Sequence, residues 1–219
     1  MHNIRLCYDW YKPQAATADH LLRTLYLKCE QMKITLLRHG KPIISSLQKI
    51  NAFEFLEWVQ EYNASGLCPS SKPTIQAFTC ARECNAIVCS DLSRSIESAR
   101  ALNAGDVVLS HAMFNEAGLP VANWYRLKFS PKIWAITFRV LWLLGYSRNS
   151  ESFKEAKRRA REAVRKLMEL ANEYESVLFV GHGIYNRMLA NELRKLGWSG
   201  PKNPGSKHWS IGVYEYQKK

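Results

Sequence analysis

The chain predicts a single α/β domain, a three-layer sandwich with a mostly parallel central sheet and helices on both faces. Short apolar runs typical of buried strands alternate with longer segments whose apolar residues recur at helical spacing. Reactive polar residues directly follow two of the apolar runs, which is typical of sheets that bind ligands beyond the carboxyl ends of their strands. The length of 219 residues allows one core and a small accessory region.

The individual elements follow from the local pattern. Strands are expected where apolar runs are short or alternate, at 34–37, 86–89, 107–109 (weak), 177–180 and 209–216. Helices are expected where apolar residues lie on one face, at about 51–64, 93–103, 151–173 and from Gly183 to about Leu196. Residues 65–73 read as a turn-rich connection.

The first 31 residues differ from the rest and suggest an N-terminal extension. A short helix at about 15–30 would place Leu21, Leu22 and Leu25 on one face. Met32 directly precedes the first strand, so it could be the true start, with the extension lying upstream. The alternative is a genuine helix packed on the domain, and the sequence leaves both open. Residues 32–219 then form one domain.

Composition restricts the partners without choosing among them. The formal net charge is +12 and the pI about 9.5, which favours anionic partners such as phosphorylated metabolites, nucleic acid or anionic membrane. The six cysteines form no C-x-x-C pair, so we expect reduced thiols in a cytoplasmic protein. No apolar leader is evident at the N-terminus. Residues 133–146 are too short to span a bilayer and contain Arg139.

Four residues at predicted loop positions supply the groups that phosphoryl transfer needs. His39 follows a strand and precedes Gly40, and a neutral imidazole is a competent phosphoryl acceptor. Arg94 lies at a strand-to-helix junction, where a guanidinium matches phosphate. His182 lies between two glycines after a strand, and Glu116 could exchange a proton with the leaving group. Taken singly, His39, Arg94 and Glu116 are each better explained as ordinary structural or exposed residues. His182 is the exception.

The three motifs together resemble the histidine phosphatase superfamily, also called phosphoglycerate mutase-like, over residues 32–219. The family pattern of a strand followed by R-H-G matches Arg38-His39-Gly40. Its S-x-L-x-R motif matches residues 90–94, and its closing strand with H-G and a nearby arginine matches His182-Gly183 and Arg187. The order and the expected elements agree, and the chain looks like a small bacterial-type phosphatase of this family.

The resemblance implies a role for each residue. His39 would become phosphohistidine, while Arg38, Arg94 and His182, with Gly183, would bind the phosphoryl oxygens. Glu116 resembles the family's acid/base residue by position, and Asp91 is a poorer alternative. The resemblance implies no metal and no cofactor.

One departure from the family favours hydrolysis over a mutase reaction. Mutases and many relatives carry a polar run after R-H-G, whereas residues 41–46 here read Lys-Pro-Ile-Ile-Ser-Ser. We therefore expect a phosphatase that hydrolyses a phosphomonoester through His39. A phosphatase for phosphohistidine on proteins and a phosphoglycerate mutase-like phosphotransferase remain the alternatives, so the partner is a phosphorylated small molecule or a phosphoprotein.

Residues 121–150, a cap-like insertion, contain five basic residues and no acidic one, interleaved with aromatic residues. Three interpretations stay open: a lid that selects the substrate, a peripheral contact with anionic membrane, or a core helix at 133–144 with solvated charges. The basic run of the helix at 151–173 shares that helix with five glutamates. It is therefore interpreted as a solvated face, and no nucleic acid is expected as a partner.

Overall fold

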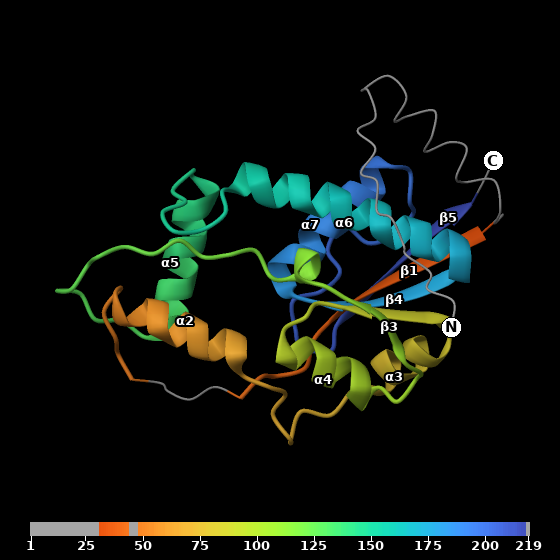
Figure 1. The fold of residues 1–219 in the computed structure, drawn as a ribbon, viewed down its shortest axis with the longest axis horizontal. Coiled ribbons are helices and arrows are strands. Elements are labelled where there is room, and N and C mark those ends of the chain that lie inside the picture. The colour runs from red at the N-terminus through yellow and green to blue at the C-terminus, as the bar shows by residue number, and fades with distance from the viewer. Residues whose placement is uncertain (1–30, 44–47, 218–219) are drawn as a thin grey trace, which may run out of the picture.

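A computed structural model describes residues 31–43 and 48–217. In this part of the chain, five strands form one sheet in the order β3-β2-β4-β1-β5 (Figure 1). The strands are β1 (Gln31–Arg38), β2 (Ala86–Cys89), β3 (Val107–Ser110), β4 (Ser176–Gly181) and β5 (Ile211–Gln217). The first four are parallel, and β5 pairs antiparallel with β1. The expected α/β class with a mostly parallel sheet is therefore confirmed.

Helices cover both faces of the sheet. On one face lie α3 (Ile75–Arg82) and α4 (Ser93–Ala101), which pack Ala81 and Ala99 against strand residues such as Leu178. On the other face lie α6 (Phe153–Tyr174) and α7 (Gly183–Lys195) (Figure 1). Helix α6 begins with a capping box between Ser152 and Glu155, and its apolar stripe is buried against the sheet.

Two further helices form a cap beside the sandwich, α2 (Glu54–Ala64) and α5 (Pro131–Leu143) (Figure 1). We call α2 together with residues 121–150 the cap. It has a small aromatic core, in which Phe55 stacks on Phe138 with ring centroids 5.5 Å apart. The indole N–H of Trp134 donates to the carbonyl of Ile50 at 2.7 Å. The cap therefore has an apolar cluster of its own, and Trp142 of α5 joins the cap to the cluster that α6 and α7 form with the sheet.

Several local expectations need correction. The last strand begins at Ile211 rather than at residue 209, because the backbone at Trp209 has a positive φ of 64°. Helix α3 was not expected, since the turn-rich residues 65–73 were not followed by a recognised helical pattern. The expected helix at 15–30, like the rest of residues 1–30, lies outside the described residues. No helix in the described ranges combines the length and apolar character needed to cross a bilayer.

Candidate active site

The carboxyl ends of the strands bring the predicted residues to one edge of the sheet. Arg38 ends β1 and His39 follows it, while His182 follows β4. Arg94 lies in the first turn of α4, directly after β2. Glu116 follows β3 and a short 3₁₀ turn, Ala112–Phe114. Because these four strands are parallel, their carboxyl ends share an edge, and residues distant in sequence meet there.

His39 is held by two main-chain carbonyls, one that contacts its backbone N–H and one that contacts its imidazole ring. It is 2% exposed, and its backbone N–H donates to the carbonyl of Gly181 at 2.9 Å. Its Nδ1 lies 2.6 Å from the carbonyl oxygen of Gly40. A carbonyl can only accept, so Nδ1 carries the proton, and the lone pair of neutral His39 is on Nε2. None of the described residues hydrogen-bonds Nε2 in this structure, so that nitrogen is free to act as a nucleophile.

The surroundings keep His39 neutral. Burial lowers the pKa of His39 well below its usual value of 6.5, and the positive charges of Arg94 and Arg38 lower it further. Gly40 is required beside it, because a Cβ at that position would overlap the side chains of Trp209 and Leu67. The nucleophilic form of the imidazole is therefore the form present at neutral pH.

His182 faces His39, with the ring centroids 5.0 Å apart. It is 1% exposed, and its Nε2 lies 2.6 Å from the hydroxyl oxygen of Ser90. If the Ser90 hydroxyl donates to Nε2, then Nδ1 carries the proton, and Nδ1 is buried without a partner. Burial, followed by His39 and Arg94, lowers the pKa of His182 well below its usual range. In that tautomer, neutral His182 offers a donor beside the nucleophile.

Arg94 is a buried cation fixed by the end of helix α2. It is 1% exposed, and its Nη1 donates to the carbonyl of Tyr62 at 3.0 Å. Its Nη2 donates to the side-chain oxygen of Asn63 at 3.2 Å, and its guanidinium lies over the Tyr62 ring. Within the described residues it forms no ion pair with a carboxylate. A buried guanidinium held by neutral acceptors is suited to an external anion.

Three unsatisfied donors belong to the predicted phosphate ligands. Nε of Arg38, Nε of Arg94 and Nδ1 of His182 are buried and have no hydrogen-bond partner. Buried polar groups are normally paired, and an unpaired one at a site commonly marks a place for a ligand. Arg38 also donates through Nη1 to the carbonyl of Ser206, which orients its guanidinium. These donors define a place where an anion would supply the missing acceptors.

The N-terminus of α7 accounts for the positions of Glu116 and Gly183. The first four N–H groups of a helix lack partners within it. Here the N–H of His182 donates to the Asn186 side chain, and those of Ile184 and Tyr185 donate to the carboxylate of Glu116 at 3.1 and 2.8 Å. The N–H of Gly183 is the remaining donor of the first turn. A Cβ at Gly183 would lie 3.4 Å from the guanidinium carbon of Arg38, so this residue lies beside a predicted phosphate ligand.

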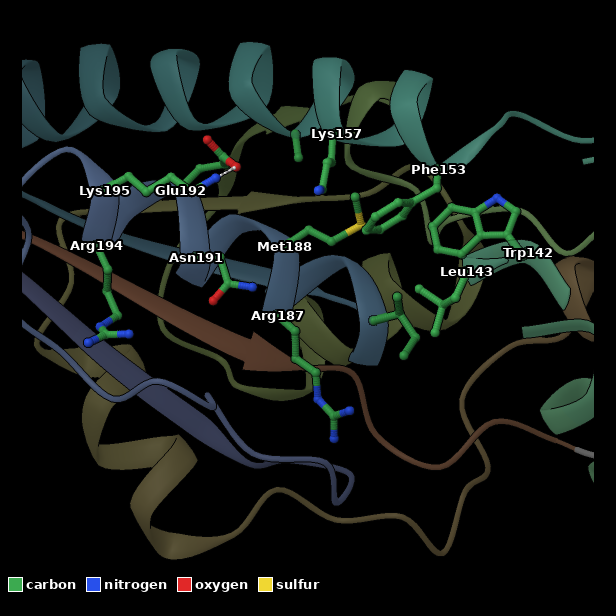
Figure 2. Close-up of a pocket in the computed structure, with 12 residues that line it drawn as sticks. Trp142, Leu143, Phe153, Lys157, Arg187, Met188, Asn191, Glu192, Arg194 and Lys195 are labelled. Carbon is green, nitrogen blue, oxygen red and sulfur yellow. Dashed lines mark hydrogen bonds and ion pairs between the residues drawn. The ribbon is translucent and has the colours of Figure 1, made fainter. Parts of the chain in front are cut away.

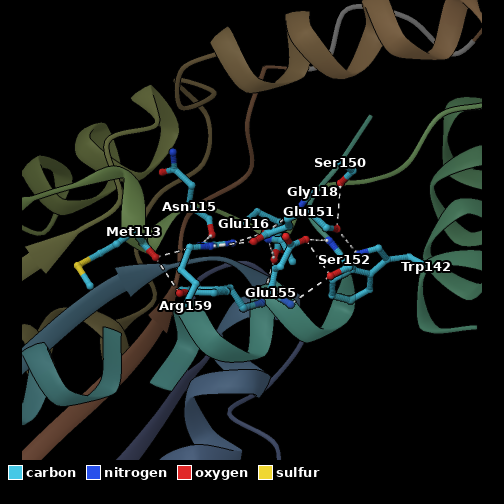
Figure 3. Close-up of polar contacts among 12 residues, drawn as sticks. Met113, Asn115, Glu116, Gly118, Trp142, Ser150, Glu151, Ser152, Glu155 and Arg159 are labelled. Atoms are coloured by element: carbon cyan, nitrogen blue, oxygen red, sulfur yellow. Dashed lines mark hydrogen bonds and ion pairs between the residues drawn. The ribbon is translucent and has the colours of Figure 1, made fainter. Parts of the chain in front are cut away.

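The loop that carries Glu116 is held by two arginines from different helices, of which Figure 3 labels Arg159. Arg159 of α6 donates to the carbonyls of Met113 and Asn115 at 2.8 and 2.9 Å and pairs with Glu151. Arg139 of α5 donates to the carbonyls of Ala117 and Gly118. The basic residues of the helix at 151–173 were interpreted as a solvated face, and this is wrong for Arg159. Arg139 of α5 is not a solvated charge either. Arg159 therefore fixes the main chain before Glu116, and Arg139 fixes the main chain after it.

A cavity of about 870 Å³ lies between this edge of the sheet and the cap. Arg38, Arg94 and Glu116 line it from the sandwich, and Lys132 and Arg139 line it from α5. Asp91 is exposed and does not line this cavity, which favours Glu116 over Asp91 as the residue near a substrate. The cavity has a volume suited to a small molecule and a lining rich in cations.

Sequence reasoning missed His208 and treated Ser90 only as part of a motif. His208 precedes β5, lines the cavity, and its ring centroid lies 5.4 Å from that of His39. Its Nδ1 lies 3.1 Å from the His39 carbonyl oxygen, and burial lowers its pKa. The signal that could have found it is position, because the start of an antiparallel β5 lies at the same edge as the end of β1.

The chain belongs to the histidine phosphatase superfamily, branch 1, whose family model matches residues 74–219. This match includes the motifs around Arg94, Glu116 and His182 and begins after Arg38-His39-Gly40. Family membership supports a phosphatase or mutase-like activity. No curated protein sequence matches the chain.

Solved structures of similar fold cover most of the chain. A mycobacterial glucosyl-3-phosphoglycerate phosphatase is 21% identical with a TM-score of 0.56, covering 84% of this chain and 90% of its own. A phosphoglycerate mutase from Bacillus anthracis is 16% identical with a TM-score of 0.55, covering 87% of this chain and 90% of its own. At these identities the likeness shows the fold.

Within residues 31–43 and 48–217, no group of three or more His, Cys, Asp or Glu residues could hold a metal ion.

Proposed function

We propose that this protein is a metal-independent phosphatase that hydrolyses a phosphomonoester through a phosphohistidine intermediate on His39. The observation that carries the proposal is the group of unpartnered donors from Arg38, Arg94 and His182 around a histidine whose tautomer leaves Nε2 as the free base. A phosphoryl group bound to these donors would place its phosphorus next to a neutral nucleophile. Family membership supports the same reaction class.

In the first step, Nε2 of His39 attacks phosphorus and the bond from phosphorus to the leaving oxygen breaks. Charge develops on the equatorial oxygens, and the donors of Arg38, Arg94 and His182 stabilise it. The Nδ1–H of His39 stays on the Gly40 carbonyl, which stabilises the positive charge that the imidazole gains. The leaving oxygen takes a proton, for which Glu116 in the cavity wall is our candidate.

In the second step, water attacks phosphorus and the phosphorus–nitrogen bond breaks, which releases inorganic phosphate and neutral His39. Glu116, ionised after the first step, would accept the proton of that water. Both of its oxygens accept main-chain N–H groups of α7, so its position relative to the cavity is fixed. The role of Glu116 in either step remains a prediction.

The cavity favours a small phosphorylated molecule over a phosphoprotein. Helices α2 and α5 of the cap supply one wall, so Arg38 and Arg94 face a walled cavity of about 870 Å³ rather than an open surface. A phosphohistidine on a folded protein would need that wall to be absent or displaced. Lys132 and Arg139 of α5 favour a substrate that carries negative charge beyond the phosphoryl group itself.

The test is hydrolysis of an aryl phosphate without added metal and with a chelator, for the wild type beside His39→Ala. We expect wild-type activity that the chelator does not change and a loss of at least about a thousand-fold in the variant. Circular dichroism must show that the variant is folded. Activity that persists in folded His39→Ala contradicts the proposal, and activity that requires a divalent metal contradicts its metal independence. Negligible hydrolysis, with transfer of the phosphoryl group between hydroxyls of a phosphoglycerate, would instead indicate a mutase-like phosphotransferase.

A further inference from the structure

Helix α5 is apolar on the face that points away from the molecule as well as on the buried face. Trp134, Phe138 and Trp142 are buried against the rest of the protein. At 3.6 residues per turn, a second set of apolar residues lies on the opposite side. These outward residues are Ile133, Ile136, Val140, Leu143 and Leu144, with exposed fractions of 46, 57, 50, 54 and 79%. We call this set the outer face of α5.

The segment before α5 continues this exposed apolar character. Trp124, Tyr125, Leu127 and Phe129 are all exposed, and the rings of Trp124 and Phe129 contact Trp134 of α5. Most of the exposed large apolar side chains in the described part of the chain lie in this segment or on the outer face of α5. A soluble monomer rarely exposes so concentrated an apolar surface without a function for it.

Charge complementarity identifies what would cover this surface. Arg126, Lys128, Lys132 and Arg148 are exposed among the apolar residues, and residues 121–150 contain no acidic residue. The exposed acids of the cap, Glu57 and Glu61, lie on the side of α2 away from Phe55, the residue that stacks on α5. The partner must therefore combine an apolar layer with negative charge.

A second groove, between α6 and α7, extends the positive charge beside the outer face of α5. It has a volume of about 620 Å³, and Trp142 and Leu143 of α5 form one end of it (Figure 2). Its lining includes four cationic residues, Lys157, Arg187, Arg194 and Lys195. Glu192 is the one carboxylate in that lining, and it pairs with Lys195 at 2.7 Å. The groove thus adds positive charge next to the exposed Leu143.

We propose that the outer face of α5, with the exposed residues of 124–129, docks this protein on the surface of an anionic lipid bilayer. The apolar and aromatic side chains would enter the boundary between head groups and acyl chains, and the cations would contact anionic head groups. A second copy of the chain fits this surface less well, because pairing two such faces would bring like charges together. Since Lys132 and Ala135 of the same helix line the catalytic cavity, docking would bring that cavity to the lipid surface.

The test is flotation of the full-length protein with two kinds of vesicle, phosphatidylcholine alone and phosphatidylcholine mixed with phosphatidylglycerol. The variants are Ile136→Glu and Val140→Glu, and the matched control is Ile75→Glu. Ile75 is 87% exposed but lies on α3 of the sandwich. All three variants change the net charge equally, so the control separates apolar contact from the general attraction of a basic protein to anionic lipid.

We expect the wild type and Ile75→Glu to bind the anionic vesicles, and Ile136→Glu and Val140→Glu to bind roughly ten-fold less or weaker still. No binding by the wild type, or equal loss in the control, overturns the proposal. Sedimentation of the free proteins provides the other decisive outcome. A wild-type dimer that Ile136→Glu converts to a monomer, without vesicle binding, would identify the outer face of α5 as a contact between copies. Ile136→Glu is also assayed for hydrolysis of a soluble aryl phosphate. A loss of vesicle binding can then be distinguished from a failure of the proposed function.

Discussion

At the carboxyl edge of the sheet polar side chains are buried, whereas in the cap apolar side chains are exposed. His39, Arg94 and His182 are each 2% exposed or less, and neutral main-chain or side-chain groups hydrogen-bond each of them. In the cap, Ile136 and Leu144 are more than half exposed. Burial of polar groups is unfavourable unless something pairs with them, and exposure of apolar groups is unfavourable unless something covers them.

The two regions therefore lack different partners. The sheet edge lacks acceptors for its unpartnered donors, and an anion would supply them. The cap lacks an apolar cover on the outer face of α5, and a lipid surface would supply it. On the two proposals above, the sandwich would perform the chemistry, and the cap would contact both the substrate and the lipid surface.

After loss of His39 itself, removal of the buried cation Arg94 should have the largest effect. Arg94→Ala removes a donor that we place on the developing charge, and it also releases the end of α2 from Tyr62 and Asn63. We expect kcat/KM on an aryl phosphate to fall by about a hundred- to a thousand-fold. The matched control is Arg100→Ala, an exposed arginine on the same helix, which should change kcat/KM less than about two-fold. Equal effects of the two changes would remove Arg94 from the phosphate site.

Loss of an aromatic side chain should show that the cap has a core of its own. Phe138 is fully buried between Phe55, Trp134 and Trp124. We expect Phe138→Ala to lower the free energy of unfolding of the region that contains it by about 3 kcal/mol or more. Tyr125→Ala, an exposed aromatic residue of the cap, should change it by about 0.5 kcal/mol or less. Hydrogen exchange across the cap is the measurement, and similar values for both variants would contradict the packing described.

Displacement of the Glu116 loop should have an intermediate effect on catalysis. Arg159→Gln removes the donors to Met113 and Asn115 and the pair with Glu151. Because Arg159 acts through the loop, we expect kcat to fall by roughly ten-fold with less change in KM. The control is Arg158→Gln, an exposed neighbour on α6, which should be close to wild type. If kcat of Arg159→Gln is also unchanged, then Arg159 does not position the loop for catalysis.

The smallest expected effect is a flat dependence of stability on pH near neutrality. Burial lowers the pKa of His39 and of His182 well below 6.5, so the unfolded chain binds these protons more readily than the folded protein. The contribution of these groups to stability is full above pH 6.5 and is lost as the pH falls through 6.5 toward the folded pKa values. Urea denaturation should show a change of about 1 kcal/mol or less between about pH 8 and pH 6.5, then a steeper decline. A free energy of unfolding that rises as the pH falls below 6.5 would contradict this.

The sequence was sufficient for features that depend on local pattern. Apolar runs located the four parallel strands, and His39 and His182 were identified because both follow such runs beside glycines. The antiparallel pairing of β5 with β1 was not predicted, since alternation in a single strand does not reveal the direction of its neighbour. His208 was missed for that reason.

The remaining site residues depend on contacts with distant parts of the chain. Arg159 is one of several cations on an amphipathic helix, and its partners are carbonyls 44 and 46 residues away. Nothing in the helical pattern distinguishes it from Arg158, which is exposed. In the same way, the apolar pattern of α5 left a core helix as one of three open interpretations, and of this helix only Trp134, Phe138 and Trp142, together with Pro131, are buried. Which face of a helix is covered depends on the tertiary structure.

The stereochemical course at phosphorus tests the central claim most directly. A phosphate monoester made chiral at phosphorus with oxygen isotopes and sulfur would be hydrolysed in isotopically labelled water, and the configuration of the released thiophosphate determined. Transfer to His39 followed by transfer to water inverts the configuration twice, so this account predicts net retention. Net inversion would mean that water attacks the substrate directly, and it would contradict a phosphohistidine intermediate whether or not His39 is required for activity.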